Sequence, residues 1–332
     1  MRKVISLAAL TLLVAASLSA CSTASAKASN VVDAPMVCSH YVTGSAADQI
    51  TAKIPATGKP TINFPTPLSA SKLQTKVLKA GTGSRFGGNQ QISFDYAAFN
   101  AATGKELQGT SWNGTDAVTQ VVTKPAKAAA GSADFCSALA GAREGSVVAT
   151  IMSAKESHGG KANAAAGIGA NDSIIFVFKI NKVVLPRAIG DAQAAQDGFP
   201  QVVTDSTGVP GLVMQNWDAS AAPKDFKAET LIKGHGAVIK ADDFVTVHYS
   251  GYLWSSAKSQ FDSSWSKGTP ATFQLKQGAL IPGFIKALVG QRVGSQVVAI
   301  LPPSDGYGAS GAGSIPGNAT LIFVIDILAK GK

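Results

Sequence analysis

The stretch Val245-Thr246-Val247-His248-Tyr249 decides the fold of this chain, because Ile92-Ser93-Phe94-Asp95-Tyr96 matches it 153 positions upstream. In both stretches apolar and polar residues alternate, as in a half-buried β-strand. Three further pairs of blocks match in the same order, at offsets of 153, 149 and 147 residues: 78–83 with 231–236, 135–141 with 284–290, and 174–177 with 321–324. An unchanged order with a slowly drifting offset predicts two tandem copies of one domain.

Each copy is predicted to combine several strands with one short helix. The helices are expected at 133–139 and 282–288, where Gly141 and Gly290 are placed to end them. The remaining segments have the pattern of strands joined by turns, in keeping with 34 Gly and 15 Pro among 332 residues. The predicted fold class is α+β with mostly antiparallel strands.

The N-terminus has the features of a targeting segment. Arg2 and Lys3 precede an apolar run over 4–16, which is shorter than the about 20 residues that span a bilayer. Leu18-Ser19-Ala20-Cys21 follows and resembles the lipobox of bacterial lipoproteins, in which the Cys becomes the lipid-modified first residue of the mature chain. The alternative is an ordinary signal peptide that is cut after Ala24-Ser25-Ala26.

These features divide the chain into five segments. The stretch between the copies is rich in Asp, Ala, Gln, Gly and Pro, which indicates a linker and an extension to the second domain. The predicted segments are a signal peptide (1–20), the lipidated Cys21 with a tether and N-terminal extension (21–71), the first domain (72–185), the linker (186–225) and the second domain (226–332). Lipidation predicts a location at the extracytoplasmic face of the bacterial cell membrane.

Charge and cysteine content limit the function further. The formal net charge is +9, but no run of five Lys or Arg and no basic stripe with aromatics occurs, so no nucleic-acid partner is expected. Besides Cys21, the chain has Cys38 and Cys136, an even pair that favours a disulfide in an oxidising exterior. Free thiols, or a metal site that includes His40, are the alternatives. No second ligand cluster or phosphate-binding loop is present, so we expect no metal and no cofactor.

Five motifs of the second copy have the order and spacing of a known family. They are Val247-His248-Tyr249-Ser250-Gly251, Phe261-Asp262-Ser263-Ser264, Leu280-Ile281-Pro282-Gly283-Phe284, Pro303-Ser304-Asp305-Gly306-Tyr307-Gly308 and the stretch 315–323. On these motifs the chain resembles the FKBP-type peptidyl-prolyl isomerases over 226–330, and in degraded form over 72–184. The resemblance implies two tandem FKBP-like domains, each a curved antiparallel β-sheet wrapped around one short α-helix.

The resemblance also implies an apolar pocket that accepts proline. Carried onto this sequence, the pocket has catalytic Tyr249, Phe261, Asp262, Ile281, Phe284, Tyr307 and Phe323, and substrate-binding Leu280 and Ile315. Two positions depart from the family: Phe284 stands where eukaryotic members have Trp, and Ala271 stands where an aromatic residue is usual. Because side chains alternate along a strand, His248 is expected on the face opposite Tyr249 and outside the pocket.

This chemistry requires neither a nucleophile nor a metal. Rotation about an X–Pro bond is opposed by amide resonance, with a barrier of about 18–20 kcal/mol. A dry apolar pocket favours the twisted, less polar state, and the resemblance assigns the Ile281 N–H and the Tyr307 hydroxyl to the flanking carbonyls. Asp262 is expected at the pocket edge, where it orders Tyr249 or the surroundings of the twisted carbonyl. Taken singly, Asp262 fits a turn residue and the phenylalanines fit a core, so the prediction depends on their joint order.

The first copy has lost the polar groups of this pocket. The residues at the matching positions are Tyr96, Leu107, Gln108, Phe135, His158, Ile168 and Phe176. The Phe–Asp pair has become Leu107-Gln108, and the loop Tyr has become His158. We therefore expect a non-catalytic or weakly active module, which holds clients or spaces the second domain from the membrane.

The sequence thus predicts a membrane-anchored isomerase that acts on proline-containing exported polypeptides as a monomer. Macrolide inhibitors are expected as further ligands by resemblance. The alternatives are a non-catalytic proline-binding chaperone, and a structural or surface-interaction lipoprotein with two inert domains.

Overall fold

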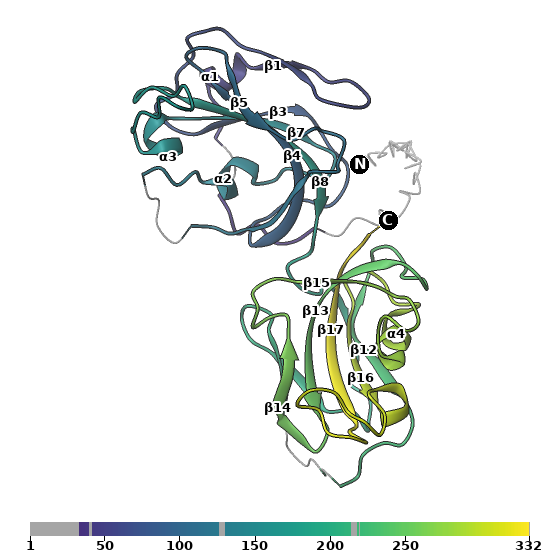
Figure 1. The fold of residues 1–332 in the computed structure, drawn as a ribbon. Coiled ribbons are helices and arrows are strands. Elements are labelled where there is room, and N and C mark those ends of the chain that lie inside the picture. The colour runs from purple at the N-terminus through teal and green to yellow at the C-terminus, as the bar shows by residue number, and fades with distance from the viewer. Residues whose placement is uncertain (1–32, 40–41, 126–129, 214–217, 219, 332) are drawn as a thin grey trace, which may run out of the picture.

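The computed structural model describes residues 33–39, 42–125, 130–213, 218 and 220–331. Cys21, the predicted lipobox and His40 lie outside the described residues. Within these ranges, no helix is long and apolar enough to cross a membrane. Figure 1 shows two bodies, one in purple to teal and one in green to yellow, and each is built on an antiparallel sheet. The prediction of antiparallel sheets with few helices is confirmed.

The first body contains a six-stranded sheet in the order β3-β7-β8-β4-β5, with β6 also paired to β4. Its strands are β3 (Gln74–Lys79), β4 (Gln90–Asn100), β5 (Glu106–Gly109), β6 (Val118–Val122), β7 (Val147–Met152) and β8 (Ile174–Val183). Helix α2 (Phe135–Leu139) packs against one face, which we call the inner face, and α3 (Ala154–His158) follows β7.

The second body contains a seven-stranded sheet in the order β14-β13-β17-β16-β12-β9, with β15 also paired to β13. Its strands are β9 (Gly190–Ala192), β12 (Lys227–Gly234), β13 (Phe244–Leu253), β14 (Ser256–Ser263), β15 (Ala271–Gln274), β16 (Gln296–Leu301) and β17 (Leu321–Lys330). Helix α4 (Pro282–Leu288) buries Phe284, Ala287 and Leu288 against the inner face, and a 3₁₀ turn, η1 (Pro303–Asp305), follows β16.

The helix ends follow from local sequence. Helix α4 has the predicted bounds and begins with Pro282, whose missing N–H is tolerated in the first turn. Helix α2 begins at Phe135 rather than at 133, because Asp134 is the N-cap and its carboxylate accepts the Ser137 N–H at 3.0 Å.

The two bodies have matching strand registers at several positions. In the first, Tyr96 lies opposite Phe178 and Ala98 lies opposite Gln108. In the second, Tyr249 lies opposite Ile325 and Gly251 lies opposite Asp262. The matching residues are 147 to 154 positions apart, close to the offsets of the sequence blocks, so equivalent positions can be assigned residue by residue.

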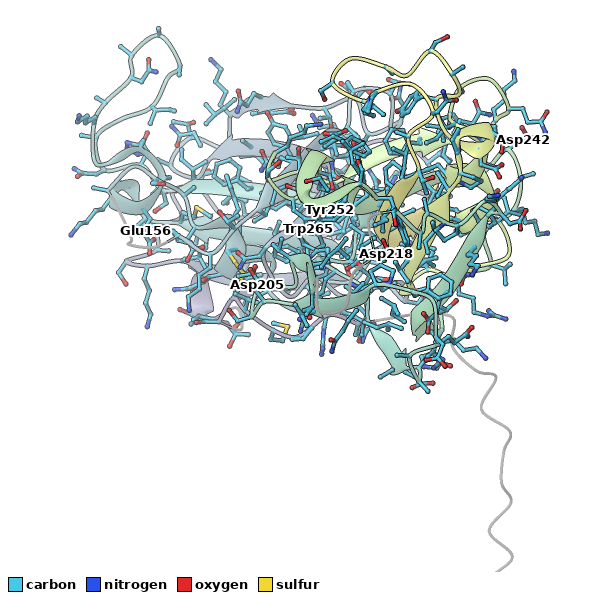
Figure 2. All side chains as sticks on the ribbon, turned by 90° about the horizontal axis from the view of Figure 1, so that it is seen from below. Glu156, Asp205, Asp218, Asp242, Tyr252 and Trp265 are labelled. Atoms are coloured by element: carbon cyan, nitrogen blue, oxygen red, sulfur yellow. A yellow bond between two sulfur atoms is a disulfide. The ribbon has the colours of Figure 1, made fainter. Side chains whose placement is uncertain are left out.

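The segment 186–225, predicted as a linker with an extension to the second domain, forms strands of its own. Strand β9 extends the second sheet by pairing with β12, and β10 (Gln201–Thr204) and β11 (Pro210–Val213) form a hairpin. Phe199, Val202 and Leu212 of this segment pack on the outer face of the second sheet. The Tyr252 hydroxyl of that face donates to the Pro210 carbonyl at 3.1 Å, and Figure 2 labels Tyr252 and the hairpin residue Asp205.

The predicted N-terminal extension covers the first sheet in the same way. Helix α1 (Ser45–Asp48) and the hairpin of β1 (Thr51–Lys53) and β2 (Thr61–Asn63) pack on the outer face of that sheet. The reason in both bodies is that the central strands are apolar on both faces: every residue of β7 and of β16 is buried. Each repeat therefore includes the hairpin segment that precedes its sheet.

Cys38 and Cys136 form a disulfide, with their Cα atoms 5.6 Å apart. The bond joins the N-terminal extension to α2, and both residues are buried in the inner core of the first body. Asp33 adds an ion pair between the same extension and the segment that joins α2 to β7, since its carboxylate lies 2.7 Å from the Arg143 guanidinium.

Candidate active site

A cleft of about 530 Å³ opens on the inner face of the second sheet, beside α4. Its walls come from β13, β14, β15, β17, the loop before α4, and the loop after η1. The lining residues are mostly aromatic or aliphatic: Tyr249, Phe261, Asp262, Phe273, Gly278, Ala279, Leu280, Ile281, Pro282, Phe284, Tyr307 and Phe323. The structure thus brings together eight of the nine predicted pocket residues, and their roles remain predictions.

The floor of the cleft is a preformed set of aromatic rings. The Phe284 ring lies 5.3 Å from that of Phe323 and 5.9 Å from that of Tyr249, with interplanar angles of 84° in both pairs. The Phe261 ring meets Phe323 edge to face at 5.7 Å. Edge-to-face contacts at these distances are favourable and hold the rings in place before any ligand binds.

Gly251 makes this ring arrangement possible. It lies on β13 under the Phe261 and Phe323 rings, and a Cβ placed there would lie 2.6 Å from the Phe261 ring. The first body has Ala98 at the equivalent position and Leu107 in place of Phe261. Because Leu107 is smaller than Phe261, it leaves space for the methyl group of Ala98, which Gly251 lacks.

Asp262 is the one carboxylate that lines the cleft. It accepts a short hydrogen bond from the Tyr249 hydroxyl, and the Lys267 ammonium lies 2.6 Å from its other oxygen. Burial alone would raise the pKa of Asp262, but the hydrogen bonds from Lys267 and Tyr249 and the Lys267 charge outweigh it and lower that pKa. Burial and the bond to Asp262 raise the pKa of Tyr249, so the phenol stays protonated and donates.

Two further polar groups face the cleft without a protein partner. Ile281 is the N-cap of α4 with an extended backbone, and its N–H has no hydrogen-bond partner among the described residues. Tyr307 is 38% exposed, and within the described chain its hydroxyl is likewise unpaired. A donor at each position is therefore available to the carbonyl oxygens of a bound peptide.

Ile315 is the one predicted pocket residue that the structure places in the core beside the cleft, and its role remains a prediction. This residue does not line the cleft and is 8% exposed within the inner core. A tight turn is the reason, since the backbone N–H groups of Ala312 and Ile315 each donate to the carbonyl of the other, at 3.0 and 2.8 Å. The turn draws the side chain under the loop rather than into the cleft.

Sequence reasoning missed Phe273, which lines the cleft. Its ring lies 5.7 Å from that of Phe284 and 6.0 Å from that of Tyr249. Ala271 and Phe273 lie two apart on β15 and share a face, so strand alternation was the available signal. Phe273 thus supplies an aromatic ring to the cleft from the strand on which Ala271 replaces the usual aromatic residue.

His248 lies outside the cleft, as strand alternation predicts. Its Nδ1 lies 2.9 Å from the Ser264 hydroxyl, and its ring stacks on Trp265 at 3.9 Å; Trp265 is labelled in Figure 2. Burial lowers the pKa of His248 to about 4, so the ring is neutral near pH 7.

The first body has a smaller pocket, of about 180 Å³, at the equivalent place. Of the matching residues that the sequence assigned, Tyr96, Gln108, Phe135 and Phe176 line it. Leu107, His158 and Ile168 do not. The His158 ring nitrogens lie 2.8 Å from the Lys161 and Asp172 carbonyl oxygens, which hold the ring within its own loop.

Comparison with known proteins agrees with this geometry. Residues 236–328 match the family described as FKBP-type peptidyl-prolyl cis-trans isomerase. The chain is 39% identical to an FK506-binding protein of Streptomyces anulatus over 109 residues, which is 32% of this chain and 87% of that protein. It is 48% identical over 154 residues to the FKBP-type peptidyl-prolyl cis-trans isomerase FkpA of Aeromonas hydrophila, which is 46% of this chain and 53% of that protein.

A third relative is FK506-binding protein 2 of Emericella nidulans, with 44% identity over 86 residues, 26% of this chain and 63% of that protein. The fold and the cleft define a protein of the prolyl isomerase class. The chain belongs to the family of FKBP-type peptidyl-prolyl cis-trans isomerases.

Proposed function

We propose that the second body catalyses cis–trans isomerisation of X–Pro bonds in exported polypeptides. The observation that carries this proposal is the cleft of about 530 Å³, in which aromatic walls surround one ordered carboxylate and two unpaired donors. Family membership supports the same activity. The body itself is proposed to be the catalytic member of two tandem FKBP-like domains, in each of which the sheet wraps around a short helix.

The mechanism follows from what each group does to a twisting amide. A proline ring placed among Tyr249, Phe284 and Phe323 is shielded from water, and this favours the twisted state, whose carbonyl carries less charge. The Ile281 N–H and the Tyr307 hydroxyl bind flanking carbonyl oxygens and fix the peptide on both sides of the bond. Asp262 holds the Tyr249 phenol in one orientation, so the wall of the cleft does not rearrange while the X–Pro bond rotates.

We further propose that the chain is anchored by lipid on Cys21 and acts at the extracytoplasmic face of the bacterial membrane as a monomer. The lipobox-like Leu18-Ser19-Ala20-Cys21 supports the anchor, and a disulfide between Cys38 and Cys136 is compatible with an oxidising exterior. The cleft is also proposed to accept macrolides of the FK506 class, because the Streptomyces relative is named as an FK506-binding protein.

A protease-coupled assay tests the activity. The mature chain is mixed with a short X–Pro peptide that the protease cuts only in the trans form, and the rate of the slow phase is followed. We expect a rate that rises in proportion to protein concentration and falls when an FK506-type macrolide is added. Binding of the peptide without acceleration would instead support the chaperone alternative.

Fractionation tests the anchor. The change Cys21→Ala is expected to move the protein from the membrane fraction to the soluble fraction and to leave the isomerase rate per molecule unchanged. Unchanged fractionation would reject lipidation at Cys21.

A further inference from the structure

The first body retains a small aromatic pocket, although the catalytic groups are lost. Its lining has five aromatic rings, two glutamine amides and one valine: Phe94, Tyr96, Gln108, Val118, Gln120, Phe135, Phe176 and Phe178. We propose that this pocket binds a proline, or an apolar side chain of similar size, in an extended peptide, without catalysing its isomerisation. The proposal rests on the proposed function of the second cleft, because the two sites occupy equivalent positions.

Strand register establishes that equivalence. Phe94 lies opposite Val118 in the first sheet, and Val247 lies opposite Ala271 in the second. By the same offset of 153 residues, Gln120 takes the place of Phe273. Gln108 takes the place of Asp262, 154 residues further on, because Gln108 lies opposite Ala98 as Asp262 lies opposite Gly251. The floor rings Phe135 and Phe176 correspond to Phe284 and Phe323 of the catalytic cleft.

The floor of the first pocket is as ordered as that of the second. The Phe135 ring lies 5.3 Å from Phe176 at 87° and 5.5 Å from Phe178 at 79°. Phe94 also meets Phe178 edge to face, at 5.3 Å. Helix α2 carries Phe135, and the adjacent Cys136 is fixed by its disulfide. A rigid, preformed apolar site binds with little ordering of its own side chains.

The rim of the pocket offers polar groups that suit a peptide backbone. Among the described residues, the Tyr96 hydroxyl and the side-chain amides of Gln108 and Gln120 have no hydrogen-bond partner. An amide both donates and accepts, so it can pair with a backbone carbonyl or with a backbone N–H. In the catalytic cleft the equivalent phenol is already bound to Asp262. The unpaired groups of the first pocket are therefore free for a ligand.

Volume and charge define the ligand. A pocket of about 180 Å³ is smaller than the roughly 300–1,000 Å³ of sites for drug-sized ligands, so it accepts one side chain and excludes a macrolide. None of the described residues that line it is charged, which favours an uncharged apolar side chain. With both sites on one chain, a long client can be held at the first while a proline is processed at the second.

The same features explain why binding is not accompanied by catalysis. No ordered carboxylate holds Tyr96, and the residue matching Tyr307 is His158, whose ring is bound within its own loop. A peptide bound in the first pocket thus lacks the fixed donors that flank the twisting bond in the second cleft.

The test is a titration of the full mature chain, followed by two-dimensional amide NMR, with a capped, uncharged Ala-Phe-Pro-Ala peptide. We expect chemical-shift changes around Gln120 and Phe135 as well as around Ile281, with separate saturation of the two sets. An FK506-type macrolide is expected to abolish only the Ile281 set. Absence of any change around Gln120 and Phe135 at saturation of the second site would overturn the proposal.

Matched variants on β6 locate the site. Val118 is half-buried at the pocket and Thr119 is exposed on the other face of the strand. Val118→Trp is expected to fill the pocket and to remove the chemical-shift changes around Gln120 and Phe135, which we call the Gln120 set. Thr119→Trp is expected to retain them. If Val118→Trp does not fold, the milder Gln120→Ala is expected to weaken binding several-fold, with Thr119→Ala as its control. Equal binding by each variant and its control would contradict the proposal.

The isomerase rate, measured on the same samples, separates this proposal from the catalytic one. Val118→Trp is expected to leave the rate on the short peptide unchanged. A wild-type chain without isomerase activity that still shows the Gln120 set, lost in Val118→Trp, would reject the proposed catalysis and support the first pocket. An active chain without chemical-shift changes around Gln120 would support the proposed catalysis and reject the first pocket.

Discussion

The two bodies share one strand order around their central strands but differ in the size and polarity of their pockets. The second has a cleft of about 530 Å³ with an Asp262–Tyr249 hydrogen bond. The first has a pocket of about 180 Å³ with two glutamines that are unpaired within the described part of the chain. The difference arises at few positions, since Gly251, Phe261 and Asp262 correspond to Ala98, Leu107 and Gln108. The comparison shows that core packing preserves a fold, while a handful of residues on two strands decide whether its pocket suits catalysis.

The largest expected effect is on stability. Loss of the Cys38–Cys136 disulfide should destabilise the first body and leave the second unchanged. Cys136→Ser is expected to lower the free energy of unfolding of the first body by about 2–5 kcal/mol, because the disulfide closes a loop of 98 residues. The second body contains no cysteine. Calorimetry of the full chain with and without reductant should shift one transition and leave the other in place. A shift of both would show that the bodies unfold together.

The next effect concerns activity in separated bodies. A fragment of 186–332 is expected to isomerise peptides at least about 100-fold faster than 33–185, a difference of about 2.7 kcal/mol in activation free energy. A third fragment, 226–332, lacks the hairpin that covers Tyr252 and the rest of the outer face, so it should melt at lower temperature. Comparable rates for the two long fragments would remove the functional distinction between the bodies.

A smaller effect is expected for the carboxylate at the cleft. Asp262→Val should lower kcat/KM about tenfold, or about 1.4 kcal/mol, because the Tyr249 phenol loses its fixed orientation. Lys267→Met should lower it only two- to threefold, since that ion pair is exposed to solvent. Melting temperatures near that of the wild type are the control. Wild-type turnover in Asp262→Val would make Asp262 a turn residue only.

The smallest effect is the contribution of Asp326 to the pH dependence of stability, which the first body should lack because Lys179 stands at the equivalent position. Burial raises the pKa of Asp326 to about 6, from 3.8 in an unfolded chain. Hydrogen bonds from the Ala188 N–H and the Gln296 amide, and the Arg187 charge, oppose this increase but do not cancel it. The folded state therefore binds the proton more tightly, and stability from this group falls as pH rises from about 4 to about 6.

This change amounts to about 1 kcal/mol between pH 5 and pH 7. The equivalent residue of the first body is Lys179, opposite Asp95 as Asp326 is opposite His248. Denaturant unfolding of 186–332 at the two pH values, compared with Asp326→Asn, measures it. An identical pH dependence in the variant would assign the effect to another group.

The inner faces of both sheets were predicted from sequence, and the cover of the outer faces was not. Alternation and order placed Tyr249, Phe261 and Phe284 together, because these residues lie on regular elements. The burial of Ile315 in the inner core was not predictable, since its position depends on a turn between Ala312 and Ile315 whose hydrogen bonds leave no pattern in the sequence.

The hairpins that cover the outer faces had a detectable signal that we missed. Thr57-Gly58-Lys59-Pro60 and Thr207-Gly208-Val209-Pro210 lie 150 residues apart, within the range of the other repeats. Gly58 and Gly208 have φ of 84° and 98°, which a turn between two short strands requires and which other residues rarely adopt. The polar, Gly- and Pro-rich composition of both segments indicated linkers, although a few apolar residues suffice to cover a sheet.

A reciprocal exchange of three residues in the full mature chain tests the central claim most directly. One variant carries Gly251→Ala, Phe261→Leu and Asp262→Gln, and the other carries Ala98→Gly, Leu107→Phe and Gln108→Asp. In the protease-coupled assay, the first variant should lose at least about 30-fold in kcat/KM, while the second keeps the wild-type rate, because groups that act together in catalysis are not restored by partial replacement. Retained activity in the first variant, or a second catalytic site gained in the other, would contradict the account.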